Sequence, residues 1–166
     1  MALAGSYPVR DYREGDATYI ADIMKRAIQE IGPRAYSPEQ IEAWSSRCFT
    51  HDSVKARVEL GHRFFVATTE QDLPIAYTLL EEDGHLDHLY CDPEHTCIGV
   101  ANDLLAHAEQ QARTAGCERL YTEASELARA AFERAGYRVV RRRDFTIPYE
   151  GRDVPIHNYA MEKALR

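Results

Sequence analysis

The residues with the clearest chemical potential lie between positions 85 and 105. Residues 85–91 are rich in aromatic and apolar residues and predict a strand, which Pro93 ends because proline lacks a backbone donor. A helix is predicted to begin at Gly99. Free backbone N–H groups gather at a helix start, and the helix dipole favours negative charge there. Gly99 and the small Ala101 would let an anion approach the main chain, so this stretch predicts a phosphate-binding turn.

Other interpretations of this stretch are open. A strand, a loop with one glycine and a helix also occur through packing alone, and the sequence contains neither GxGxxG nor a P-loop motif. Several side chains are of metal-ligand types, namely His85, Asp87, His88, Cys91, Asp92 and His95. Strand alternation scatters them over two faces without CxxC or HExxH spacing, so we expect no metal. Cys97 would have a lowered thiol pKa at a helix start, but we favour a filler role.

Length and composition bound the class of protein. A chain of 166 residues suits one domain over 1–166, and 45% hydrophobic with 28% charged residues is ordinary for a globular protein. No stretch approaches 18 apolar residues and the start does not resemble a signal peptide, so we expect a cytoplasmic protein without membrane contact. The net charge of −7 argues against nucleic-acid binding and suits an amine substrate.

The surrounding sequence predicts the elements that would position these residues. Apolar residues at three- and four-residue spacing predict a helix over 20–31. Residues 37–40 (SPEQ) predict a capping box, Asp52 or Ser53 is expected to cap a third helix, and Ser125 a helix over 125–135. A long helix is expected over 99–115. The expected strands cover 9–12, 63–69, 73–82, 85–91, 120–123, 137–144 and 154–162.

Residues 96–101 resemble motif A of the GNAT superfamily, the acyl-CoA-dependent N-acyltransferases. That motif follows a strand and a proline, starts with Gln or Arg, and has Gly at its fourth and Gly or Ala at its sixth position. Gly99 and Ala101 fit, whereas Thr96 departs from it. Residues 132–137 (FERAGY) resemble the second motif, in which a helix ends in an aromatic residue, three others, Gly and an aromatic residue. The DHLY strand and the NYAMEK ending are most similar to the bacterial YafP-type branch.

The resemblance implies an α/β fold of mixed α+β type, the GNAT fold, with a mostly antiparallel, splayed central sheet flanked by helices. It implies acetyl-CoA as co-substrate, with a strand bulge near Leu89 and Tyr90 that frees main-chain amides. Arg129 and Arg134 would meet the adenosine phosphate, and Thr96 reaches less far than Gln or Arg. The implied cofactor-binding residues are Leu89, Tyr90, Cys91, Thr96, Cys97, Ile98, Gly99, Val100, Ala101, Asn102, Arg129 and Phe132.

Acyl transfer to an amine calls for a base, and Asp87 and His88 are the candidates. Histidine has the better unperturbed pKa, at about 6.5. Strand alternation places His88 with Leu86 and Tyr90 on one face and Asp87 on the other, so that only one of the pair readily faces a given cleft. The alternative is that His88 is a half-buried strand residue hydrogen-bonded to a neighbour.

The family's frequent general acid is a Tyr in the second-motif helix, and the matching residue is Phe132, which cannot donate a proton. Three side chains are candidate substitutes through water, namely Ser125, Tyr121 and Cys117. Tyr36 and Trp44 would wall the acceptor pocket, although a lone Trp is often core. The run Arg141, Arg142 and Arg143 alternates along its strand, which favours a solvated sheet edge over one basic patch.

The sequence therefore predicts an N-acetyltransferase that moves an acetyl group from acetyl-CoA to a primary amine by direct attack. The acceptor would be a small molecule or a peptide, and relatives make a homodimer an option. The departures at Thr96 and Phe132 keep open an alternative, a GNAT-fold module that binds acyl-CoA without turnover and acts as a sensor.

Overall fold

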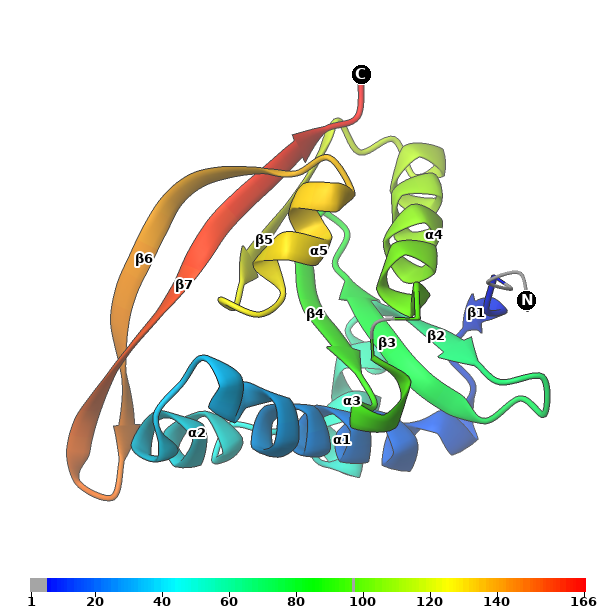
Figure 1. The fold of residues 1–166 in the computed structure, drawn as a ribbon. Helices are drawn as coiled ribbons and strands as arrows, with labels where there is room; N and C mark the ends of the chain where they lie inside the picture. Colours follow the sequence, from blue (N-terminus) through cyan, green and yellow to red (C-terminus); the bar gives the residue numbers. More distant parts are fainter. Residues whose placement is uncertain (1–5, 97) are drawn as a thin grey trace.

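The computed structural model describes residues 6–96 and 98–166, and its strands form two antiparallel sheets (Figure 1). The first sheet has the order β1-β2-β3-β4 and consists of β1 (Val9–Asp11), β2 (Arg63–Thr68), β3 (Pro74–Leu80) and β4 (Leu86–Cys91). The second has the order β5-β7-β6 and consists of β5 (Arg119–Ala124), β6 (Arg138–Tyr149) and β7 (Arg152–Ala164). A parallel bridge between His85 and Tyr121 joins the sheets, and β4 and β5 diverge beyond it. The predicted splayed, mostly antiparallel sheet is confirmed.

Helices cover both faces of the first sheet. α1 (Ala17–Arg26), α2 (Pro38–Ser45) and α3 (His51–Glu59) lie on one side, and α4 (Val100–Thr114) lies on the other. Each side has its own core, because β-strand side chains alternate between faces. One core includes Phe64, Val66, Tyr77 and Leu79 under α1, and the other includes Phe65, Leu86, Leu104 and Leu120 under α4. Fully burying one such side chain is worth about 1.5–3 kcal/mol.

The predicted helix over 20–31 changes its winding before it ends. Its α-helical part stops at Arg26, a π-helical turn η2 (Ala27–Ile31) follows, and a 3-10 turn η3 (Gly32–Arg34) closes it. π-Turns insert one extra residue and often occur at functional sites. Ala27, Ile28 and Ile31 of this turn line a cavity described below.

Two of the predicted helix starts differ in the structure. The capping box at Ser37 and Gln40 is confirmed, since the Ser37 hydroxyl accepts from the Gln40 N–H at 3.2 Å. For α3 the prediction of Asp52 or Ser53 is wrong, because Thr50 caps the helix and exchanges hydrogen bonds with Ser53. Ser125 caps only a short turn, and α5 (Arg129–Arg134) begins four residues later than expected.

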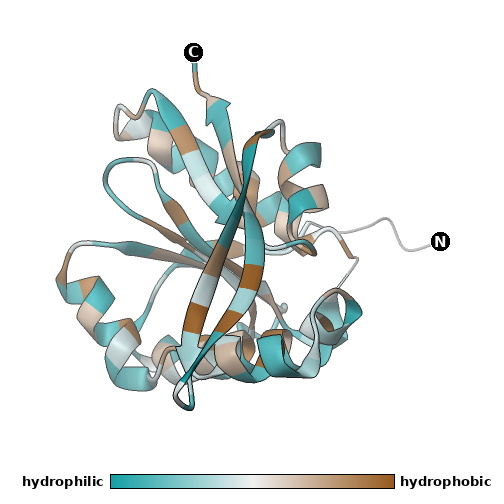
Figure 2. Ribbon diagram, turned by 90° about the vertical axis from the view of Figure 1, so that its left-hand side faces the viewer, coloured by the Kyte–Doolittle hydropathy of each residue, from teal (hydrophilic) through white to brown (hydrophobic). Residues whose placement is uncertain are grey.

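The long β6–β7 hairpin extends beyond the predicted strands and crosses the front of the molecule in Figure 2. Hydrophilic and hydrophobic segments alternate along it in that view. Ile147, Val154 and Ile156 are buried against the α1-side core. Glu150 and Gly151, both at positive φ, form the turn between the two strands. The hairpin therefore forms one wall of the space between the diverging sheets.

The bulge in β4 lies upstream of its predicted place. Leu80 pairs with Leu86 and Leu79 with His88, so Asp87 is the extra residue, rather than Leu89 or Tyr90. A bulge breaks the strict alternation of a strand. Leu86 consequently belongs to the α4-side core, while His88 packs on Tyr77 of the opposite core. The predicted face shared by Leu86 and His88 is thus wrong.

Candidate active site

Two cavities meet between the diverging sheets. The first, of about 540 Å³, lies between η2, β4 and the start of α4, and we call it the α4 cavity. The second, of about 430 Å³, lies between β4, β5 and the β6–β7 hairpin, and we call it the hairpin cavity. Both are lined by Trp44, Leu89, Tyr90, Ser125 and Ala128, which form the wall that they share. A ligand in one cavity would therefore abut a ligand in the other.

The α4 cavity brings together most of the residues that motif A singled out. Its lining includes Cys91, Thr96, Gly99, Val100, Ala101 and Asn102. Gly99 has φ 88° and is the N-cap of a 15-residue helix that has no side-chain cap. The first-turn amides thus face the cavity end of the helix without a competing side chain. Ile98 is exposed, and Cys97 lies outside the described residues.

Two arginines add positive charge to this cavity. Arg34 of η3 and Arg134 of α5 both line it, and neither forms an ion pair with any residue that the structure describes. Guanidinium groups and helix-start amides are the donors that phosphate groups use in proteins. The donor set therefore fits the phosphates of coenzyme A despite the net charge of −7.

Arg129 and Arg134 were both predicted to contact the cofactor, but only one of them lines the α4 cavity. Arg129 donates to Glu133 at 2.8 Å and its guanidinium lies 4.5 Å from the ring centroid of Tyr159, so it is engaged within its own surroundings. Arg134, rather than Arg129, lines the α4 cavity. The Thr96 hydroxyl lies 3.5 Å from the Pro93 carbonyl oxygen and also lines this cavity.

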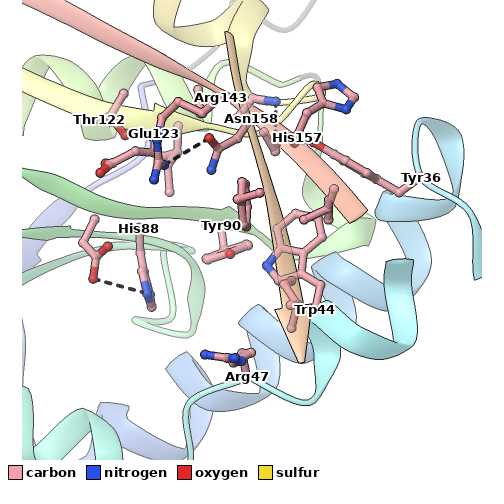
Figure 3. A pocket seen from close by; sticks show the side chains of 18 of the residues that line it. Tyr36, Trp44, Arg47, His88, Tyr90, Thr122, Glu123, Arg143, His157 and Asn158 are labelled. Atoms are coloured by element: carbon pink, nitrogen blue, oxygen red, sulfur yellow. Dashed lines mark hydrogen bonds and ion pairs between the residues drawn. The ribbon is translucent and has the colours of Figure 1, made fainter. Parts of the chain in front are cut away.

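Aromatic side chains wall the hairpin cavity, as Figure 3 shows for Tyr36, Trp44 and Tyr90. The rings of Tyr36 and Trp44 meet edge to face with centroids 5.4 Å apart. The Tyr36 hydroxyl donates to the His157 carbonyl at 3.0 Å and accepts from the Glu126 N–H at 2.8 Å, which fixes its ring. Burial raises the pKa of Tyr36. The predicted pair thus lies in one cavity, and Trp44 reaches both.

His88 lies in this cavity wall but is only 8% exposed. Its Nδ1 is 3.0 Å from the Tyr77 hydroxyl, and its main-chain carbonyl accepts from the Thr78 hydroxyl at 2.7 Å. Burial lowers the pKa of His88 to about 4, which outweighs the opposite effect of Asp87. The imidazole is therefore neutral at physiological pH and a weak proton acceptor.

Asp87 and His88 line the same cavity, contrary to the prediction that only one of them would face a given cleft. The reason is the bulge at Asp87, because the two residues of a bulge do not follow normal alternation. The Asp87 carboxylate accepts from Arg57 of α3 at 2.9 Å, and it lies 3.7 Å from His88 Nε2.

A network of charged side chains extends from Asp87 to β5. Arg57 also donates to Glu81 at 2.6 Å, and His85 lies between Glu81, at 2.7 Å, and Glu123, at 2.5 Å. Burial alone would lower the pKa of His85, but its hydrogen bonds to the two glutamates outweigh this and raise it to about 9. His85 is therefore protonated at neutral pH, and Glu123 lines the hairpin cavity beside it.

Phe132 lines the hairpin cavity and packs edge-on against Tyr137 with centroids 5.0 Å apart. Of the three hydroxyl or thiol groups predicted as substitutes for the missing acid, Ser125 lies in the shared wall. Tyr121 instead donates to Asp83, and Cys117 to the Glu82 carbonyl.

Four cavity residues were not singled out from the sequence, namely Arg47, Glu123, His157 and Asn158, and Arg143, predicted at a solvated sheet edge, also lines the cavity. One signal was present for Arg143. Arg143, Phe145 and Ile147 are two residues apart along β6 and therefore share one face of the strand, and the two apolar residues mark it as the inner face. Nothing comparable marked Arg47, which lies in the connection between α2 and α3.

Comparison with known proteins agrees with this geometry. A family model described as acetyltransferase (GNAT) domain matches residues 33–161. The chain therefore belongs to the GNAT acetyltransferase family. It is 28% identical over 133 residues to the uncharacterized N-acetyltransferase YafP of Escherichia coli (strain K12), covering 80% of this chain and 82% of YafP.

Solved structures show the same fold. The GCN5-related N-acetyltransferase from Rhodopseudomonas palustris has a TM-score of 0.86 and 28% identity, over 99% of each chain. The PaiA N-acetyltransferase from Thermoplasma acidophilum, solved with coenzyme A, has a TM-score of 0.74 and 18% identity, over 96% of this chain and 99% of that one.

Two further findings bear on other classes of function. In residues 6–96 and 98–166, no three His, Cys, Asp or Glu side chains gather in a way that could hold a metal ion. The described helices are also too short or too polar to cross a bilayer.

Proposed function

We propose that this chain is an N-acetyltransferase that transfers the acetyl group of acetyl-CoA directly to a primary amine. The observation that carries the proposal is the pair of cavities that share Leu89, Tyr90 and Ser125. One has the donors for phosphates, and the other has charged and aromatic side chains. The PaiA N-acetyltransferase, which has a similar fold, was solved with coenzyme A, and this supports coenzyme A as the ligand.

The roles of the chain's residues follow from this arrangement. Arg34, Arg134 and the first-turn amides of α4 would hold the phosphates of coenzyme A, which supplies an activated acetyl thioester. Main-chain groups at Leu89 and Tyr90, where β4 has diverged from β5, would orient the acyl carbonyl at the shared wall. The acetyl group would then face the hairpin cavity.

Proton transfer would use carboxylates and a hydroxyl. Asp87 and Glu123 line the amine side, where they attract the ammonium form and take its proton through water. We assign His88 a positioning role, because its imidazole is buried and bonded to Tyr77. The Ser125 hydroxyl, in the shared wall, would donate a hydrogen bond that stabilises the leaving thiolate where the tyrosine is absent, and the thiolate would take its proton from solvent water.

Calorimetric titration with acetyl-CoA, with free coenzyme A and ATP as controls, tests the α4 cavity. We expect binding of about micromolar Kd for both coenzyme A forms. Arg134→Gln should weaken binding about 10-fold through loss of a charge-assisted contact, whereas Arg129→Gln on the same helix should leave it unchanged. Equal effects of the two variants would contradict the assignment.

Turnover decides between catalysis and the alternative of a non-catalytic acyl-CoA-binding module. The assay follows release of the coenzyme A thiol with a panel of primary amines. Acetyl-CoA binding without release above the rate of protein-free buffer, for every amine in the panel, would favour the binding module.

A further inference from the structure

The charges around the hairpin cavity are separated between its walls. On the β4–β5 side, the carboxylates of Glu81, Asp87 and Glu123 contact two cations, Arg57 and His85. Asp87 and Glu123 line the cavity, whereas Glu81 lies behind them and bonds both cations, so two carboxylates face a ligand on this side. This side of the cavity suits an ammonium group.

The opposite charge is found on other elements. Arg143 of β6 and Arg47 of the α2–α3 connection both line the cavity, and neither forms an ion pair with a residue in the described part of the chain. Figure 3 shows them on different walls, with Tyr90 and Trp44 between. Arg143 Nη1 donates to Asn158 Oδ1 at 3.1 Å, and the guanidinium lies 5.5 Å from the Phe145 ring centroid, so it is held by neutral groups.

These arginines are unusual in this acidic chain. Most of its other arginines contact carboxylates, as Arg142 does with Asp144 next to Arg143. A guanidinium in a partly enclosed cavity without a carboxylate is available for an anionic ligand, which it can bind in a bidentate manner. Between the two charged sides the walls are largely apolar and aromatic, including Phe49, Tyr90 and Phe145.

We propose that the acceptor is an amine that also carries an anionic group on an apolar body, as in a free hydrophobic amino acid. Arg143 binds the carboxylate, Arg47 adds positive charge from another wall of the cavity, and the β4–β5 side receives the amine. This inference rests on the proposed function for the reaction, but the binding that it describes can be measured without turnover.

Trp44 provides the readout, because it is the chain's one tryptophan and lines the cavity. We would titrate the protein with L-leucine and follow Trp44 fluorescence, with calorimetry in parallel. 3-Methylbutylamine, which lacks the carboxylate, and leucinamide, in which it is uncharged, serve as matched ligands. Leucine should bind about 10-fold more tightly than either, as expected for one charge-assisted bidentate contact.

The variants locate the contact. Arg143→Gln should reduce the preference for leucine to less than about 3-fold, and Arg47→Gln should reduce it by a smaller factor, because Arg47 is the more exposed. Arg141→Gln, on the same strand but solvent-exposed, should leave the preference intact. Circular dichroism checks that each variant is folded.

Two results would overturn the inference. The first is that leucine binds no more tightly than 3-methylbutylamine and leucinamide, or does not bind at all up to about 50 mM, a concentration that would detect even very weak binding. The other is a preference that survives both Arg143→Gln and Arg47→Gln.

Thiol release from acetyl-CoA, measured on the same ligands, separates the two proposals. Acetylation of 3-methylbutylamine as fast as leucine would leave the enzyme assignment intact and overturn the acceptor class. Selective leucine binding without acetylation would support the ligand class of the hairpin cavity and overturn the enzyme assignment.

Discussion

The α4 cavity and the hairpin cavity share a wall but are built in different ways. The first combines the helix-start turn, with His95, Thr96 and residues 99–102, and residues from η2, η3, β4 and α5. The second is made by side chains from α2, β4, β5, β6 and β7. A main-chain site depends on local conformation, which short motifs specify, whereas a side-chain site depends on how distant elements are packed.

The largest effect should come from the main chain of the α4 cavity. Gly99→Ala places a methyl group at φ 88°, in open space beside the first turn, and should weaken acetyl-CoA binding about 100-fold by blocking close approach. The measurement is the calorimetric Kd.

Gly116→Ala is the matched control for this substitution. Gly116 follows the other end of α4 at φ 83°, also with open space for a methyl group. Both variants should lose about 1 kcal/mol of stability from the left-handed conformation, but only Gly99→Ala should lose the ligand. An equal loss of acetyl-CoA binding in both variants would mean that backbone strain, rather than the phosphate-binding turn at Gly99, explains the result.

The next effect concerns the shared wall. Ser125→Ala should lower kcat about 10-fold with little change in the KM for acetyl-CoA, since the hydroxyl acts on the leaving thiolate. Steady-state kinetics measure both constants. Tyr121→Phe removes a hydroxyl that is bonded to Asp83 and should leave kcat unchanged. A normal kcat in Ser125→Ala would remove Ser125 from the mechanism.

In the hairpin cavity, the buried His88 should make the stability of the protein depend on pH. Its pKa of about 4 in the folded state lies below the unfolded value of about 6.5, so the unfolded chain binds the proton first. Stability should therefore fall as pH is lowered from 6.5 to 4, by on the order of 3 kcal/mol. Urea unfolding of wild type and His88→Gln measures this, and the variant should lack that pH dependence.

Kinetics of the same variant test the role of His88. If it only positions β4 and Tyr77, His88→Gln should change kcat/KM by less than about 3-fold. A loss of 100-fold or more, on the scale of removing a general base, would instead restore His88 as the base.

The last prediction concerns His85. Its folded pKa of about 9 lies above the unfolded value of about 6.5, so its contribution is complete below pH 6.5 and is lost as pH rises through 9. The stability difference between wild type and His85→Gln should shrink over this window. A difference that stays constant from pH 6.5 to 9 would show that His85 does not hold a proton between Glu81 and Glu123.

Local signals in the sequence predicted most of the helices and strands and the phosphate-binding turn at Gly99, whereas their arrangement in space was predicted from the resemblance to a family. Hairpin turns, apolar periodicity and the Gly99 helix start are each readable within a few residues. Tyr36 and Trp44 carry no such local signal, and they were predicted near the acceptor only from the resemblance to a family. Thr96 and Phe132 were seen as departures, but their consequences depend on neighbours such as Ser125.

The hairpin cavity could not be predicted in the same way. The bulge at Asp87 reverses the faces assigned by strict alternation, and nothing in the sequence of β4 indicates it. The low pKa of His88 comes from burial beside Tyr77, and the high pKa of His85 from glutamates on β5 and before β4. These effects depend on how the strands and their connections pack, which no local pattern in the sequence specifies.

The central claim is that both substrates are bound at once, on either side of the wall formed by Leu89, Tyr90 and Ser125. The most direct test is a matrix of initial rates of thiol release, with acetyl-CoA and the best acceptor varied together. Direct transfer between adjoining cavities predicts double-reciprocal lines that intersect. Parallel lines, which indicate an acetylated enzyme formed before the amine binds, would contradict the account.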